Sequence, residues 1–168
     1  MSSGVLEEAI KKAAIAWISV ADGPAHALWC MPFETSLVVV SGPGEQFAPG
    51  LADARQATVR LRGDHGGLIV LADAEVTRLT PGTEEWEQIA PQLAGKRLNA
   101  TGSTDEVVTR WSTDGCALVR LTPAAETALG AADVPAESHA APPRETPARV
   151  ETRHPFRLHH VRKPPPAT

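Results

Sequence analysis

The residues best placed to do chemistry lie in one stretch, 37–51. Its apolar start, residues 37–40, predicts a buried strand, and Ser41-Gly42-Pro43-Gly44 predicts a tight turn before a short helix over 47–54. Backbone N–H groups at such a strand–turn–helix junction point outward and can hold an anion such as a phosphate. The stretch contains no lysine or arginine. An anion at this corner would therefore lack the charge-assisted hydrogen bonds that a basic side chain supplies.

The histidines and cysteines indicate no second reactive site. His26 and His65 lie beside predicted turns, where histidines are usually solvated, and no Ser-His-Asp or Cys-His arrangement supports nucleophilic catalysis. Cys30 and Cys116 lie in apolar strand-like segments without CxxC spacing, which predicts buried, reduced thiols. The pair His159-His160 lies in a tail that offers no fixed frame for ligands, so we expect no metal site.

Composition narrows the class of protein. Apolar residues make up 42% of the 168 residues, but aromatic residues only 4%, with no tyrosine, so the core must be aliphatic. The net charge of -4 argues against general affinity for nucleic acid or for acidic membrane surfaces. The apolar runs are too short to span a bilayer, and the N-terminus shows no secretion signal. We therefore expect a cytoplasmic protein with no membrane partner and no nucleic-acid partner.

Hydrophobic periodicity and turn residues predict a mainly β fold with helices. The predicted helices cover residues 6–14, 47–54, 83–88 and 105–111. The predicted strands cover residues 15–20, 26–33, 37–41, 57–62, 68–79 and 116–121. Thr83 is the expected N-cap of its helix, because acidic residues fill the first turn after it. Short strands joined mostly by hairpin-length turns imply an antiparallel sheet that closes into a barrel, with the helices packed outside.

A change in composition near Thr122 divides the chain. Residues 1–122 carry the periodic patterns and form the predicted domain. Residues 123–147 are rich in proline and alanine and keep no periodic apolar face, which predicts a disordered linker. Residues 148–168 form a basic tail that also carries apolar side chains such as Phe156. Such a tail suits docking on the barrel groove or on a second subunit.

The order of these elements resembles the flavin-binding split β-barrel family, whose best-known member is pyridoxamine phosphate oxidase. The likeness rests on the opening strand pair, residues 15–20 and His26-Ala27-Leu28-Trp29, and on a third strand that ends in Ser41-Gly42-Pro43-Gly44. It covers roughly residues 5–121. The resemblance implies a six-stranded antiparallel split barrel flanked by short α-helices. It also implies a homodimer with flavin in a groove at the subunit interface, acting on a small-molecule substrate.

The resemblance assigns cofactor contacts to eight positions: Leu28, Trp29, Cys30, Met31, Ser41, Gly42, Gln46 and Arg60. The four on the second strand would lie along the flavin ring, donating and accepting through their backbone groups, and Ser41 would contact the phosphate. Many relatives carry an Arg-Lys pair in the loop after the third strand, where this chain has Gln46 and Phe47. Arg60 is a substitute source of positive charge. Gly42 has the alternative role of a simple turn glycine, and Trp29 that of a core aromatic residue.

Two functions from different classes follow. One is an FMN- or deazaflavin-dependent oxidoreductase whose substrate is unassigned, in which the cofactor carries the chemistry and the protein orients it. The other is a cofactor-free dimeric binding or scaffold protein on the same fold. The Ser-Gly-Pro-Gly corner favours the first function, and the missing loop cations favour the second.

Overall fold

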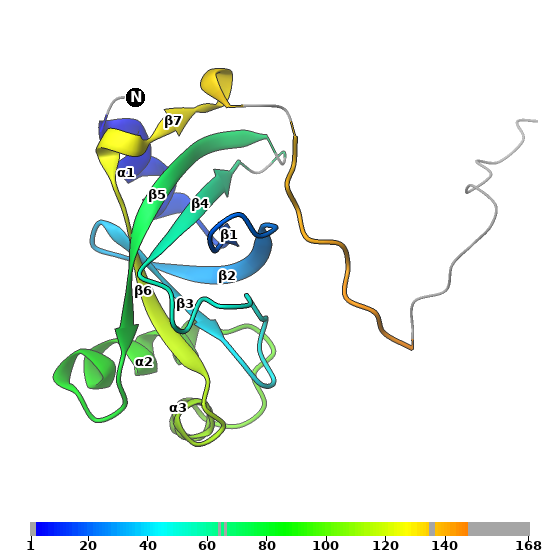
Figure 1. Cartoon of the computed structure of the whole chain (residues 1–168). Helices are drawn as coiled ribbons and strands as arrows, with labels where there is room; N and C mark the ends of the chain where they lie inside the picture. The colour runs from blue at the N-terminus through cyan, green and yellow to red at the C-terminus, as the bar shows by residue number, and fades with distance from the viewer. Residues whose placement is uncertain (1–2, 64, 66, 135–136, 148–168) are drawn as a thin grey trace, which may run out of the picture.

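Six antiparallel strands close into a barrel in the computed structural model, which describes residues 3–63, 65, 67–134 and 137–147 (Figure 1). Strand pairing runs β4-β1-β2-β3-β6-β5, and β5 also pairs with β4, which closes the ring; a short seventh strand, β7, pairs with β5. The strands are β1 (Ile15–Ser19), β2 (His26–Phe33), β3 (Ser36–Ser41), β4 (Gln56–Arg62), β5 (Leu68–Leu79), β6 (Ala117–Pro123) and β7 (Leu129–Gly130). The predicted six-stranded antiparallel barrel is confirmed.

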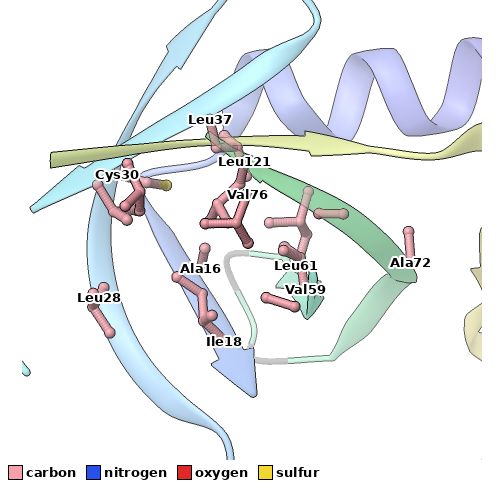
Figure 2. Close-up of a cluster of buried hydrophobic side chains, with 14 of the residues drawn as sticks. Ala16, Ile18, Leu28, Cys30, Leu37, Val59, Leu61, Ala72, Val76 and Leu121 are labelled. Atoms are coloured by element: carbon pink, nitrogen blue, oxygen red, sulfur yellow. The ribbon is translucent and has the colours of Figure 1, made fainter. Parts of the chain in front are cut away.

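The barrel interior is filled by the alternate apolar residues of each strand. In β4, Val59 and Leu61 point inward and are almost fully buried, while Arg60 between them faces outward. Figure 2 shows these two side chains inside the ring, in the same cluster as Ile18 of β1 and Leu28 of β2. Helix α1 (Ser3–Lys12) also contributes buried residues to this aliphatic core. The period-two pattern is therefore sufficient to place the core.

A second core lies between the outside of the barrel and two helices, α2 (Glu84–Lys96) and α3 (Thr104–Thr113). Here Val38 and Val40 of β3 pack with Trp86 and Trp111 of the helices. Because its other face points into the barrel, β3 is buried along its whole length. This burial on both faces explains why β3 is a continuous apolar run and does not alternate.

The helix boundaries follow local capping. The side chain of Thr83 accepts a hydrogen bond from the backbone N–H of Trp86, which confirms the predicted start of α2. Ser103 and Glu106 form a capping box at the start of α3. In the described part of the chain, no helix is long and apolar enough to cross a membrane.

The predicted helix over residues 47–54 is wrong, because this stretch is a series of turns. Leu51 N–H donates to Ala48 O, and Asp53 N–H donates to Gly50 O, both with turn spacing. Gly50 has a φ of +78°, which is incompatible with a right-handed helix, and Pro49 offers no backbone N–H. The apolar residues that suggested a helix instead anchor the turns, since Leu51 is fully buried in the barrel core.

The region after β6 contains short elements: the 3-10 turns η1 (Ala125–Thr127) and η2 (Ala131–Asp133) on either side of β7. Farther along, Ala140 forms a parallel bridge with Ala25, just before β2. The division of the chain into a domain of residues 1–122, a linker of residues 123–147 and a tail stays a prediction. The tail, residues 148–168, lies outside the described residues.

Candidate functional site

The first half of β2 has an open backbone edge. Cys30 N–H donates to Ala14 O at 2.9 Å, on the β1 side. Since peptide groups alternate sides along an antiparallel strand, those of Ala27 and Trp29 face away from β1. The neighbouring strand on that side, β3, pairs with β2 only from Cys30 onward. The sheet therefore splits between residues 25–29 and the segment that follows β3.

Two groups occupy the ends of this open edge. Trp29 N–H donates to the Gln46 Oε1 atom at 2.6 Å. Ala25 N–H donates to His139 O at 2.7 Å, and Ala141 N–H donates to Ala25 O at 2.8 Å. Between them, the N–H and C=O of Ala27 have no hydrogen-bond partner among the described residues. An adjacent donor and acceptor in a fixed strand can recognise the edge of a flat heterocycle.

A groove of about 1250 Å³ lies along this edge. Its floor includes Trp17 of β1 and Trp29 of β2, and the loop after β3 contributes Phe47 to its rim. The exposed residue Leu98, just after α2, and the segment 141–144 form the other walls. A groove of this size with an apolar lining and a few polar groups has the properties of a small-molecule or cofactor site.

The groove is positively charged although the chain is acidic. Among the described lining residues, four are cationic: Lys11, Lys96, Arg97 and Arg144. One carboxylate, Glu45, lines it, so the formal charge of the lining is +3 with histidine neutral. The whole chain carries -4. Such a concentration of one sign in a concave surface raises the local potential and attracts anionic ligands.

Glu45 fixes the loop after β3 to the helix layer. Its side chain is only 3% exposed; the Oε1 atom accepts from Trp111 Nε1 at 2.9 Å, and the Oε2 atom accepts from Arg97 Nε at 2.9 Å. Arg97 also donates to Gly44 O at 3.4 Å. These bonds position the next residue, Gln46, whose side chain caps the open edge of β2. The carboxylate thus acts as a structural anchor of the groove wall.

The two cysteines offer little nucleophilic reactivity. Burial raises the pKa of the Cys30 thiol to about 12, although this residue reaches the groove lining. Burial also raises the pKa of Cys116, and the nearby carboxylates of Glu45 and Asp114 raise it further. Both thiols therefore stay protonated near neutral pH. Among the described residues, no group of three or more histidine, cysteine or acidic side chains could hold a metal ion.

Three of the eight predicted contact residues, Trp29, Cys30 and Gln46, line the groove together. Leu28 points into the barrel core, and Met31 packs beneath the helices. The Leu28 side chain is separated from the groove by the strand itself, whereas Met31 lies on the same face as Trp29 and is covered by the helices.

The predicted phosphate corner is mainly a structural feature. The Ser41 hydroxyl is buried and accepts a hydrogen bond from Ala48 N–H at 2.9 Å. At Gly42, with φ +155°, a Cβ atom would lie 2.8 Å from the Cα of Cys116. Neither residue is part of the groove lining. Gly42 therefore permits a close approach of the loop to β6, which is the turn-glycine alternative considered above.

Arg60 lies on the outer face of the barrel, apart from the groove lining. Its Nη1 atom donates to the Ser19 hydroxyl at 2.8 Å. Partial burial and the neighbouring charge of Arg62 lower the pKa of Arg60 below its usual value. The guanidinium of Arg62 lies 5.4 Å from the centre of the Trp17 ring, a cation–π contact at the back of the groove floor.

Sequence reasoning missed most of the polar groups of the groove. Lys96 and Arg97 end a helix some fifty residues after the loop that they approach, and Arg144 lies in the predicted linker. No local pattern connects these positions. The strand pattern did hold a signal for Ala27, because residues 27 and 29 must face the same side of β2.

Comparison with known proteins identifies the fold. No family model matches the sequence, and no curated protein matches it. Among solved structures, HutZ, the heme storage protein from Vibrio cholerae, aligns with a TM-score of 0.54 at 16% identity over 76% of this chain and 93% of that one. The chain shares the split-barrel fold of this structure.

Two further structures have lower scores. A FAD-binding protein from Mesorhizobium loti aligns with a TM-score of 0.49 at 14% identity, over 74% of this chain and 91% of that one. A Listeria innocua protein assigned as a pyridoxamine 5'-phosphate oxidase aligns with a TM-score of 0.49 at 11% identity, over 73% and 92%. At these identities the comparisons concern the fold alone.

Proposed function

We propose that this chain is a flavin- or deazaflavin-dependent oxidoreductase that acts as a homodimer on a small-molecule substrate. The observation that carries the proposal is the groove at the split of the barrel. It combines an aromatic floor, an N–H and a C=O of Ala27 that have no partner among the described residues, and a net positive lining. A flavin-type cofactor presents a flat ring with donor and acceptor edges and an anionic tail, so each feature of the groove has a counterpart.

The chain's own residues would bind, orient and shield the cofactor. The Ala27 peptide group and the free amide nitrogen of Gln46 would fix the heterocycle edge, and Trp17 and Trp29 would pack against its ring. Lys96, at the end of α2, would meet the anionic tail in place of the absent loop cations. When bound, the cofactor accepts and donates the hydride, a reaction that needs few acid–base groups from the protein.

Exposed apolar residues support the homodimer. Phe47 is 60% exposed and Leu98 is 86% exposed, and both border the groove. Covering these side chains with a second copy would remove apolar surface from water and enclose the ligand. In light scattering, Leu98→Ser should shift the protein toward monomer, whereas Val5→Ser, an exposed apolar change on α1, should not.

The two free cysteines suit a reducing, cytoplasmic location.

Titration of the purified full-length chain with FMN, riboflavin and a deazaflavin tests the proposal. We expect quenching of cofactor fluorescence at micromolar concentrations, with one site per chain. Lys96→Gln should weaken FMN binding about threefold to tenfold and leave riboflavin binding unchanged, because riboflavin lacks the phosphate. Failure of all three cofactors to bind would contradict the proposal.

The second candidate is a cofactor-free binding or scaffold protein on the same fold. It is favoured by the buried Ser41 hydroxyl, which already accepts from Ala48 N–H, and by a loop without cations. A stable dimer that binds no flavin or deazaflavin would support this function.

A further inference from the structure

The segment that follows η2 is attached to the start of β2 by a defined pair of hydrogen bonds. Ala25 N–H donates to His139 O, and Ala141 N–H donates to Ala25 O, which forms one rung of a parallel ladder. Ala25 is fully buried, so these bonds are shielded from water at one end. Figure 1 shows this segment, drawn in orange, passing beside β2 before it leaves the barrel. The segment after η2 therefore adds one parallel bridge, Ala140 to Ala25, at the start of the open edge of β2.

The ladder stops at an identifiable residue. In a parallel ladder, the rung at Ala25 would be followed by a rung at Ala27, with N–H of residue 143 donating to Ala27 O. Residue 143 is proline and has no N–H, so this bond cannot form. The Ala27 carbonyl consequently receives no donor from this segment, although its neighbours on the same edge, Ala25 and Trp29, both have partners. The Ala27 N–H, which the next rung would pair with Ala141 O, has no partner among the described residues either.

Beyond the rung, the segment forms a wall of the groove. Ala141, Pro142 and Pro143 line it, and so does Arg144. Two consecutive prolines favour an extended, stiff backbone, which fixes the direction in which the chain continues. Arg144 therefore adds a cation from a part of the chain that sequence patterns assign to a linker.

We propose that residues 139–144 form a strap that walls the groove, leaves the carbonyl of Ala27 open because of Pro143, and brings Arg144 to the anionic part of the bound ligand. This inference rests on the proposed function for the identity of the ligand, but the attachment of the strap can be measured without one. The strap makes the linker region part of the binding site. It also selects for ligands that carry negative charge beside a flat ring.

Amide hydrogen exchange of the ligand-free, full-length chain tests the attachment. We expect the Ala25 amide to be protected in the wild type and to exchange about tenfold faster or more in Ala141→Pro, which removes the donor to Ala25 O. Ala141→Ser keeps that donor and should preserve protection. In Pro143→Ala, the new amide at position 143 can donate to Ala27 O and should be protected, while the new amide at position 142 in Pro142→Ala lies at the wrong register and should exchange fast. A fast-exchanging Ala25 amide in the wild type would overturn the strap.

Titration with FMN and riboflavin tests the role of Arg144. Arg144→Gln should weaken FMN binding about threefold to tenfold and leave riboflavin unchanged, and Arg144→Lys should restore part of the loss. Arg78→Gln is the matched control, because Arg78 is an exposed arginine on β5 outside the groove lining.

Equal FMN affinity of Arg144→Gln and wild type would overturn the assignment of Arg144 while leaving the proposed function intact. If wild type binds no flavin, the proposed function and this assignment fail together, and hydrogen exchange still decides the strap.

Discussion

The two halves of β2 have the same alternating pattern but opposite surroundings. In the second half, Met31 is covered by α2 and α3 and belongs to the second core. In the first half, Trp29 and Ala27 face an open groove, and the neighbouring strand is missing. One half is therefore a packing surface, and the other lines a groove. The difference comes from what lies beside the strand, since both halves alternate in the same way.

Trp111 marks the boundary between the two halves. It is fully buried in the helix layer, and its ring centre lies 6.5 Å from that of Trp29 in the groove. Trp111→Ala should lower the free energy of unfolding by about 3–5 kcal/mol, because it leaves a large cavity. Trp29→Ala should cost only about 1–2 kcal/mol, since that side chain is half-buried, but it should weaken FMN binding more strongly. Urea denaturation and ligand titration of both variants would separate the two surfaces, and equal stability losses would contradict the comparison.

Gly42 tests whether the predicted phosphate corner is structural. Gly42→Ala places a Cβ atom 2.8 Å from the Cα of Cys116, and we expect a loss of about 2–4 kcal/mol from overpacking and backbone strain. Gly44→Ala meets no atom within 4 Å, and its φ of +74° alone should cost about 1 kcal/mol. Thermal unfolding of the pair provides the measurement. Similar losses for the two variants would show that the contact with Cys116 is unimportant.

Glu45 connects the covered half to the open half. Glu45→Ala leaves Trp111 Nε1 and Arg97 Nε without an acceptor, which should cost about 1–3 kcal/mol. Glu45→Gln keeps an acceptor oxygen for Trp111 and should lose less. Arg97→Ala removes a partly exposed partner and should cost at most about 1 kcal/mol. A double-mutant cycle in chemical denaturation would measure the coupling, and a value near zero would mean that the pair does not hold the loop.

The buried thiols predict a stability loss at high pH. The pKa of Cys30 is raised in the folded state to about 12 from an ordinary value of 9.0. Its contribution to stability is therefore complete below about pH 9 and is lost as the pH rises toward 12. The slope from one thiol is at most about 1.4 kcal/mol per pH unit. Denaturation midpoints measured across this range should fall less steeply in Cys30→Ala than in the wild type, and identical slopes would place Cys30 in a wetter environment.

Local patterns were enough to predict the barrel and were insufficient for its groove. The alternation in residues 57–62 and the apolar run 37–40 each determine which side chains must leave water, so the strands and the core follow. The same approach predicted a helix over 47–54, because it counted apolar residues and gave too little weight to Pro49 and Gly50. The eight cofactor contacts stay a prediction, but the structure adds a position on β2 that the sequence did not single out: Leu28 faces the core, whereas Ala27 faces the groove.

The sequence by itself determined the order of strands along the chain, the aliphatic core of the barrel and the N-cap Thr83 of α2, because these depend on residues close together in the chain. Only the tertiary structure decided where β2 loses its neighbour, which cations line the groove, and how Glu45 reaches both Trp111 and Arg97. Those contacts join residues separated by 52 and 66 positions in the case of Glu45. Separations of this size leave no periodic trace, because such side chains meet only after the barrel has closed.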